Sequence, residues 1–418
     1  MTGMNRLTNT IRPYAWGSTT AIPELLGTPP TGEPQAELWM GAHPGAPSRI
    51  DRGQGPIPLD TVIDADPTAE LGEATVKRFG PHLPFLFKVL AAGAPLSLQV
   101  HPDLDQAAAG YADEEARGIP LDAPNRNYKD ANHKPEMIVA LSPFVGLCGF
   151  RRPTEAADLI DALGIPTLAP YVDILRAHPE DRALREVLAA VLGAEPDAMA
   201  ETVRAATEAA ARLAATPGTP HATAYAAYAS AAQSFPGDRG IIAAMLLNHV
   251  LLQPGEALYL GAGVPHAYLS GLGVEIMANS DNVLRCGLTP KHIDVPELLR
   301  IVRFEAGDPG VLRPEAAPDG EELYPAPIDE FRLSRHLLAP GADPRTLPSG
   351  TPQILLCTSG EVRLRTLDGP ELEPDTTSSP SAPAGTLTLV QGESAYVPAG
   401  ERIELTGQGT LFRATVTA

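Results

Sequence analysis

The chain has 418 residues, 44% of them hydrophobic, and a formal net charge of -20 at pH 7. This apolar content is typical of a folded globular protein, whereas the negative charge argues against a nucleic acid or an anionic membrane surface as partner. An anionic small molecule stays compatible with this charge if basic side chains gather locally.

Targeting and redox features of the sequence favour the cytoplasm. The segment MTGMNRLTNTIRPYAWG at the start lacks the apolar centre of a signal peptide. No apolar run approaches the roughly 18 residues that a membrane span needs. The three cysteines, Cys148, Cys286 and Cys357, show no CxxC or CxxH spacing, which argues against a disulfide framework or a cysteine-based zinc site. We therefore expect a reducing, cytoplasmic location.

The residue pattern changes twice along the chain. From Met1 to about Arg152, short apolar runs such as FLFKVLAA alternate with Pro, Gly and Asp, which predicts strands joined by irregular loops. The next part is rich in Ala and Leu at helical spacing, and predicts helices over 154–163, 181–192, 197–215 and 240–252. Strands are expected again after Leu252, with a Pro/Ser/Thr-rich surface loop at 373–385.

Two segments of the chain resemble each other without a gap. GEALYLGAGVPH (255–266) and GESAYVPAGERI (392–403) share Gly, Glu, Tyr, Ala and Gly at the same places, and both predict a strand, a glycine-containing turn and a second strand. Chance similarity of two β-turns is the alternative. If the repeat is real, His266 corresponds to Ile403, as expected for a duplicated small barrel in which one copy keeps a metal site.

Polar side chains in three separate segments suggest a metal site. In SLQVHPD (97–103), Gln99 and His101 lie on the same face of a predicted strand. Glu136 begins the apolar run EMIVAL, where a carboxylate facing the interior requires a cation or a proton. Taken singly, each residue is more simply a surface or satisfied core residue. Together with His266 they offer two imidazoles, a carboxylate and an amide oxygen, which suits Zn²⁺, with manganese, iron or cobalt as alternatives.

A family resemblance sharpens this interpretation. Several collinear segments over about the first 300 residues resemble the type I mannose-6-phosphate isomerases of the cupin superfamily: PYAWGS (13–18), AELWMGAHPGAPS (36–48), PFLFKVLAAGAPLSLQVHPD (84–103), NYKDANHKPEMIVAL (127–141) and GVPHAYLSGLGVEIMANSDNVLRCGLTPKHID (263–294). The resemblance implies one Zn²⁺ held by Gln99, His101, Glu136 and His266, and places Arg285 in the active site. The implied reaction interconverts mannose 6-phosphate and fructose 6-phosphate.

The resemblance also implies an architecture. We expect a mainly β protein with a helical insert and two cupin-type β-barrels, of which only the first carries metal. The catalytic barrel would comprise 1–152 and 250–310, the helical domain 153–249, and the metal-free barrel 311–418. No motif in the last 110 or so residues is diagnostic. We expect a monomer that binds a sugar phosphate.

Aldose–ketose isomerisation needs groups that move a proton between C1 and C2 and stabilise an enediolate. Arg285 is expected to stabilise negative charge, because a guanidinium is a poor base. Glu275 is our first candidate for the base, and Lys134 could assist ring opening or proton transfer. The alternatives are a solvated strand carboxylate for Glu275 and a merely neutralising charge for Lys134.

The phosphate end of the substrate needs cationic or hydroxyl donors. Lys88, Lys291 and Ser97 match family positions associated with that end. A lysine within the apolar run FLFKVL must reach water or an anion. His43 and Trp16 are assigned only to the pocket wall or to structure. Four histidines without a supporting motif are expected at the surface: His82, His178, His221 and His336.

Two other functions remain open from the sequence. A non-catalytic sugar-phosphate sensor would keep phosphate contacts but lose the metal or Arg285, whereas all the proposed residues are present. A cupin oxygenase usually has a compact His-x-His motif followed shortly by Glu. Here Gln99-x-His101 is followed by Glu136 far downstream, which favours the isomerase.

Overall fold

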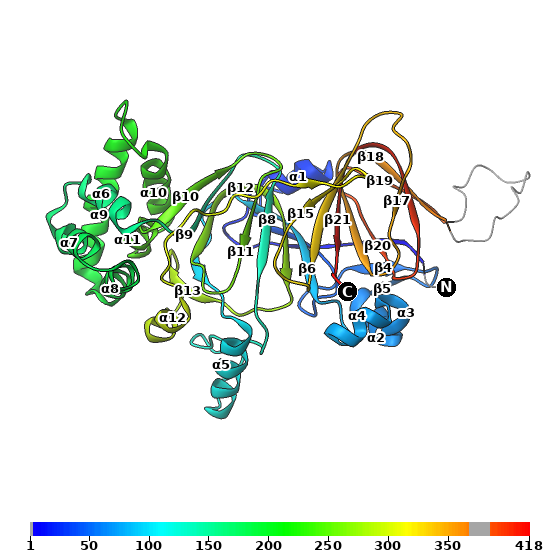
Figure 1. Cartoon of the computed structure of the whole chain (residues 1–418), viewed down its shortest axis with the longest axis horizontal. Helices are drawn as coiled ribbons and strands as arrows, with labels where there is room; N and C mark the ends of the chain where they lie inside the picture. The colour runs from blue at the N-terminus through cyan, green and yellow to red at the C-terminus, as the bar shows by residue number, and fades with distance from the viewer. Residues whose placement is uncertain (1–2, 368–384) are drawn as a thin grey trace, which may run out of the picture. The chain divides into compact units, whose positions relative to one another are not determined.

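The structure is a computed structural model that describes residues 3–367 and 385–418 (Figure 1). The loop predicted at 373–385 therefore lies almost wholly outside the described residues. The chain forms two compact units: unit 1 comprises Met1–Ala91, Val274–Asn279 and Leu312–Ala418, and unit 2 comprises Ala92–Gly273 and Ser280–Val311. Both contain antiparallel strands with helices, so the mainly β fold with helices is confirmed. The finer division into three domains stays a prediction.

The C-terminal residues of unit 1 form most of a nine-stranded sheet. Its strand order is β1-β20-β18-β21-β16-β15-β14, with β17 beside β21 and β19 beside β18. Alternate leucines such as Leu355, Leu364 and Leu411 fill the core of this sheet. The strands are β1 (Asn5–Arg6), β14 (Glu315–Ala316), β15 (Glu321–Tyr324), β16 (Arg332–Leu338), β17 (Arg345–Leu347), β18 (Gln353–Thr366), β19 (Thr386–Val390), β20 (Ser394–Val397) and β21 (Ile403–Thr415).

The N-terminal part of unit 1 contains a second group of strands. The antiparallel strands β2 (Thr10–Arg12), β3 (Glu37–Met40) and β6 (Phe85–Ala92) pair in that order. Every residue of β3 and β6 is buried, which explains why FLFKVLAA is apolar almost throughout. The sequence did not predict the accompanying helices of this part: α1 (Ala21–Leu26), α2 (Leu59–Ala65), α3 (Pro67–Leu71) and α4 (Glu73–Phe79), which lie in the chain around the hairpin of β4 (Arg49–Asp51) and β5 (Pro56–Pro58).

Unit 2 is built on strands that position the candidate site. In it β10, β9, β12, β7 and β13 are neighbours in that order, and β8 pairs with β11. The last residues of β12 belong to unit 1. The strands are β7 (Leu98–Val100), β8 (Glu136–Ala140), β9 (Phe144–Phe150), β10 (Leu247–Leu252), β11 (Ala257–Leu260), β12 (His266–Ala278) and β13 (Leu284–Gly287).

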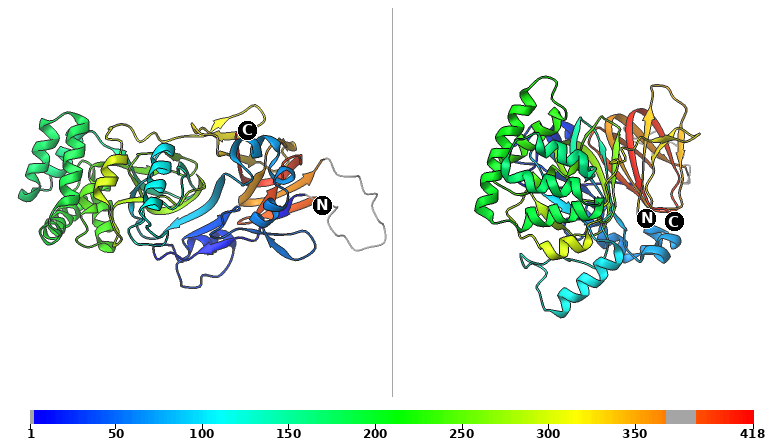
Figure 2. Two further views of the ribbon diagram at one scale, coloured as in Figure 1. Left: turned by 90° about the horizontal axis from the view of Figure 1, so that it is seen from below. Right: turned by 60° about the vertical axis from the view of Figure 1, so that its left-hand side comes forward.

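Most helices of unit 2 gather beside β9 and β10 and share one core with them, whereas the helix Leu104–Ala116 lies apart (Figures 1 and 2). Three predicted helices are confirmed as α6 (Pro153–Asp161), α8 (Glu180–Gly193) and α9 (Pro196–Ala215). The others are α5 (Leu104–Ala116), α7 (Ala169–Ala177), α10 (Ala222–Ser234), α11 (Gly240–Ala244) and α12 (Val295–Ile301). No helix of the described residues is long and apolar enough to cross a membrane.

The helix predicted over 240–252 is wrong in its second half. Only Gly240–Ala244 is helical, and Leu247–Leu252 pairs antiparallel with β9. Short apolar runs such as LNHVLL fit a helix and a buried strand equally well, so periodicity could not separate them. The pairing with a distant strand decides the conformation.

The two similar segments have the same local structure. In the first, β11 ends before a turn and β12 begins at His266, while in the second β20 ends before a turn and β21 begins at Ile403. The paired glycines adopt positive φ in both copies, 91° at Gly255 against 86° at Gly392, and 75° at Gly263 against 89° at Gly400. A side chain is strained at such φ values, which accounts for glycine at both places in each copy. The similarity of the two segments therefore extends from their amino-acid sequence to their backbone conformation.

The expectation that His336 lies at the surface is wrong. His336 is only 3% exposed, because side chains alternate along β16 and that of His336 lies on the same face as the buried Ser334. Opposite it on β15 lies Glu321, also buried. Among the described residues, neither ring nitrogen of His336 has a hydrogen-bond partner.

This buried histidine makes stability depend on pH. Burial lowers the pKa of His336 from 6.5 to about 4, against the opposing influence of Glu321. Between these values the unfolded chain binds a proton here and the folded chain does not. The free energy of unfolding should therefore fall as pH falls from 6.5 to 4, by up to about 3 kcal/mol. Urea unfolding at several pH values should show a flatter dependence for His336→Gln, and an unchanged dependence would contradict this account.

Candidate metal centre

Three predicted ligands converge inside unit 2. His101 follows β7, Glu136 begins β8 and His266 begins β12. The Nε2 atoms of both histidines point at Glu136 Oε2, at 3.4 Å from His101 and 3.5 Å from His266. All three residues are at most 2% exposed, and their ligand atoms lie within 4.8 Å of one another. The strands thus bring together three residues that are up to 165 positions apart, from His101 to His266.

The unmatched atoms of this group fit a divalent metal ion. His101 Nε2, His266 Nε2 and Glu136 Oε2 are buried without a hydrogen-bond partner among the residues that the structure describes. Buried polar atoms are normally paired, so three of them at one point indicate a common ligand. Two imidazole nitrogens and one carboxylate oxygen are donors that Zn²⁺ accepts. The residues present therefore fit the zinc that the sequence predicts.

A backbone carbonyl orients each imidazole by accepting a hydrogen bond from its Nδ1. His101 Nδ1 lies 2.8 Å from the carbonyl oxygen of Asn282, and His266 Nδ1 lies 2.9 Å from that of Val264. Because a carbonyl can only accept, each Nδ1 carries the hydrogen and donates it. Each Nε2 then keeps its lone pair directed toward Glu136, as metal-ligating histidines require.

Electrostatics favour metal-binding protonation states of His101 and Glu136. Burial lowers the pKa of His101 to about 4, so its ring is neutral at pH 7. Burial alone would raise the pKa of Glu136, but the Lys134 ammonium and the His101 ring lower it well below the usual range. Lys134 Nζ lies 2.9 Å from Glu136 Oε1, the oxygen that does not face the histidines. One carboxylate oxygen thus carries an ion pair while the other faces the imidazoles.

Strand register places Gln99 between His266 and Arg285. Gln99 on β7 is directly opposite His266 on β12 and opposite Arg285 on β13. Directly opposed residues of antiparallel strands project to the same face, with Cβ atoms about 4.5–5.5 Å apart. Gln99 is therefore a neighbour of a metal-ligand candidate on one side and of Arg285 on the other.

The Arg285 guanidinium is available for an anion. It is half-buried, and burial lowers its pKa. Among the residues that the structure describes, no carboxylate forms an ion pair with Arg285 or shifts its pKa, whereas Arg52 and Arg126 each pair with a glutamate. A desolvated cation of this kind favours binding of an anionic group.

Lys88 and Glu275 lie in unit 1, where they form a buried ion pair. Lys88 Nζ is 3.1 Å from Glu275 Oε2 and 3.6 Å from Glu37 Oε1. Glu37 also accepts a hydrogen bond of 2.6 Å from Trp39 Nε1. The anions that compensate Lys88 are therefore protein carboxylates, and its contact with a phosphate stays a prediction.

Two of the three residues predicted at the phosphate end, Ser97 and Lys291, belong to unit 2. Ser97 is half-buried just before β7, and Lys291 is exposed between β13 and α12. The sequence assigned no role to Asn282, although it lies in the polar run NSDN directly before β13. Its side chain is fully buried, and the signal that could have found it is this cluster of amide and hydroxyl residues ahead of an apolar strand.

Comparison with known families gives a consistent result. A family model described as phosphomannose isomerase type I, catalytic domain, matches residues 4–153. The chain is 41% identical to a mannose-6-phosphate isomerase of Escherichia coli (strain K12), covering 98% of this chain and 99% of that protein. It is 33% identical to a mannose-6-phosphate isomerase of Bos taurus, covering 94% of this chain and 93% of that protein.

Solved structures agree with the sequence comparison. One is mannose 6-phosphate isomerase from Salmonella typhimurium bound to fructose 6-phosphate and zinc, with a TM-score of 0.86 and 39% identity over all of both chains. Another, described as the zinc-bound holo form of a mannose 6-phosphate isomerase, gives a TM-score of 0.86 and 38% identity over all of both chains. The likeness therefore extends over the whole fold.

Proposed function

We propose that this chain, which belongs to the type I phosphomannose isomerase family, interconverts mannose 6-phosphate and fructose 6-phosphate with a bound zinc ion. The observation that carries the proposal is the buried convergence of His101, Glu136 and His266, whose facing atoms have no hydrogen-bond partner in the described part of the chain. We include Gln99 as a further ligand because its strand pairs it with His266. When bound, zinc would supply positive charge that polarises substrate oxygens.

The protein's own residues suit the other tasks of the reaction. Arg285 donates from its guanidinium to oxygens on which negative charge develops as the C2 proton leaves. Glu275 accepts that proton at a carboxylate oxygen and returns it to C1 of the enediolate. Lys134 neutralises Glu136 at Oε1 and can assist ring opening. Ser97, Lys88 and Lys291 are proposed to contact the phosphate end of the substrate.

The same family membership supports a proposed architecture. The matched turn geometry before His266 and Ile403 supports two related cupin-type barrels, of which the C-terminal one has lost the ligand. We retain the proposed division into 1–152 with 250–310, 153–249 and 311–418. A monomer in the cytoplasm is the form we expect to act.

The direct test is conversion of mannose 6-phosphate into fructose 6-phosphate by the purified chain loaded with zinc. Binding of the sugar phosphate without conversion would favour the sensor, and oxygen consumption by the iron-loaded chain would favour the oxygenase. The complete set of ligand candidates, together with an Arg285 that no described carboxylate pairs with, favours the isomerase over both.

Glu275→Gln should lower kcat by about 10²–10⁴-fold, the usual contribution of a general base. Incorporation of solvent deuterium into the sugar should slow in parallel, because the amide cannot accept the C2 proton. Glu322→Gln is the matched control, since Glu322 also pairs with a basic residue, Arg335, in unit 1. Bound zinc should be unchanged in both variants. Wild-type turnover by Glu275→Gln would assign the proton transfer to another group.

A further inference from the structure

Asn282 links a metal-ligand candidate to the loop that precedes β8. Its backbone carbonyl accepts the hydrogen bond from His101 Nδ1 at 2.8 Å. The carbonyl therefore fixes both the tautomer and the direction of the His101 ring. The position of Asn282 is in this way transmitted to His101 Nε2, the atom that faces the metal centre.

The side chain of Asn282 is held by the loop before β8. Its Oδ1 accepts from the backbone N–H groups of Lys129 at 2.7 Å and Asp130 at 3.2 Å. Its Nδ2 donates to the carbonyl oxygens of Asp130 and Asn132, both at 2.8 Å, and to Asp130 Oδ1 at 3.2 Å. The side chain is fully buried, and both polar atoms of the amide are used.

Asp130 closes this connection from the loop side. Its Oδ1 also accepts from Ser280 Oγ at 2.9 Å and from the N–H of Asn132 at 2.9 Å. Its Oδ2 accepts from the N–H of Asp281 at 2.8 Å. The segment 280–282 and the segment 129–132 are thus joined through one amide and one carboxylate.

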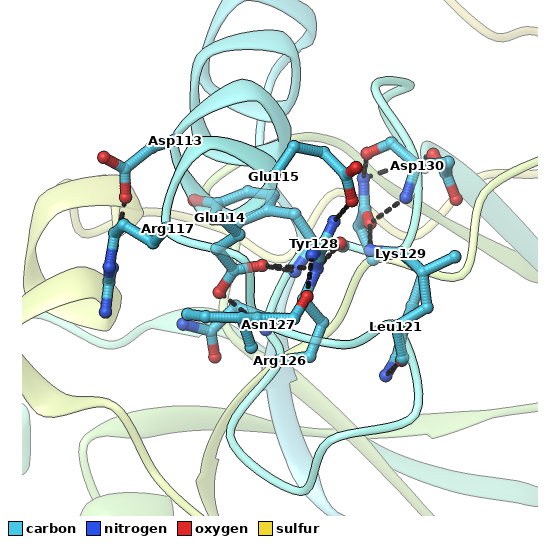
Figure 3. A network of polar contacts seen from close by, with 12 residues as sticks. Asp113, Glu114, Glu115, Arg117, Leu121, Arg126, Asn127, Tyr128, Lys129 and Asp130 are labelled. Carbon is cyan, nitrogen blue, oxygen red and sulfur yellow. Dashed lines mark hydrogen bonds and ion pairs between the residues drawn. The ribbon is translucent and has the colours of Figure 1, made fainter.

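The other end of the loop is anchored to α5. Figure 3 shows Glu114 and Glu115 beside Arg126, with ion-pair distances of 3.0 and 2.7 Å. Arg126 also donates to the carbonyl oxygen of Tyr128 at 2.6 Å, and Glu114 accepts from the N–H of Tyr128 at 2.8 Å. The loop 126–132, which we call the Asn282 loop, is therefore fixed from α5 to the residues just before Lys134.

We propose that Asn282 is a positioning residue that couples the Asn282 loop to the zinc site through His101. This proposal rests on one part of the proposed function, namely that the site binds zinc. Because the loop and the ring share one residue, ordering of either stabilises the other. Zinc binding should then protect the backbone of Lys129 and Asp130, and removing the contacts between Asn282 and these loop residues should weaken zinc binding by the same coupling.

The proposal is tested by zinc affinity and hydrogen exchange, neither of which depends on isomerase activity. Asn282→Ala keeps the carbonyl that His101 donates to but removes the side chain that holds it in place. It should weaken zinc binding by up to about 10–100-fold in a chelator competition, the range found when the support behind a metal ligand is lost. In the wild type, zinc should slow amide exchange at Lys129 and Asp130. In the variant that protection should be lost.

A second variant approaches the same connection from the loop. Asp130→Ala keeps Asn282 unchanged but removes the carboxylate that holds segment 280–282 to the loop. Like Asn282→Ala, it should weaken zinc binding. Asn127→Ala is the matched control, because the side chain of Asn127 ties the same loop to Asp294 instead of to Asn282. It should keep wild-type zinc affinity.

The outcomes separate coupling from a purely structural role. Equal zinc affinity in the wild type and in a folded Asn282→Ala or Asp130→Ala protein would overturn the proposal. Loss of affinity in Asn127→Ala to the same extent would also overturn it, since any loosening of the loop would then suffice. An inactive wild type that binds zinc and shows the protection would support the coupling while refuting the isomerase function.

Discussion

His266→Ala should lose most of its bound zinc and reduce isomerase turnover by at least about 10³-fold. The substitution removes one of two Nε2 donors and leaves Glu136 and His101 facing a gap. A metal ion contributes several kcal/mol of charge stabilisation in such reactions, and about 4 kcal/mol corresponds to three orders of magnitude in rate. Metal content per chain and kcat should be measured on the same preparation.

A matched histidine tests whether the effect is specific. His249 on β10 also lies in unit 2 and is partly buried, but it is not one of the three converging residues. His249→Ala should keep zinc and most activity. If His266→Ala retained both stoichiometric zinc and wild-type turnover, the ligand set would be wrong.

Arg285→Ala should lower kcat by about 10²–10³-fold while leaving zinc content intact, the usual effect of removing one donor to a developing negative charge. The guanidinium is half-buried and shares a strand register with Gln99, which places it beside the metal site without making it a ligand. Arg285→Lys should recover part of the loss, because it keeps the charge but not the planar pair of donors.

The control for Arg285 is an arginine of the same unit at the surface. Arg117 pairs with Asp113 on α5, and its side chain is 62% exposed. Arg117→Ala should leave kcat and KM unchanged. If Arg285→Ala raised KM and left kcat unchanged, the guanidinium would bind the phosphate end instead of acting at the reacting carbons.

The local residue pattern predicted which residues are ligand candidates and which strand face they occupy. It did not predict that they lie close together in space. Alternation along a strand suffices to place Gln99 and His101 on one face. That His266 lies opposite Gln99 depends on the pairing of strands far apart in the sequence. Such register is set by the whole hydrophobic pattern and the turns, so the residue pattern could name the four candidates but not show that they meet.

The wrong predictions for LNHVLL and His336 have a common cause. The run LNHVLL was assigned to a helix and His336 to the surface, because each was judged without its pairing partner. Lys88 was expected to reach water or an anion. The carboxylates that lie beside it, Glu37 and Glu275, come from strands that the sequence does not place there. The pairing of strands far apart in the chain decides which side chains are buried and which residues they contact. This pairing cannot be deduced from a single sequence.

Removal and return of zinc tests the central claim most directly. Formation of fructose 6-phosphate from mannose 6-phosphate should be followed before chelation, after chelation and after zinc is restored, with metal content measured at each stage. The account predicts loss of activity with the metal and recovery with it. Full activity in zinc-free protein, or no activity in protein carrying one zinc per chain, would contradict it.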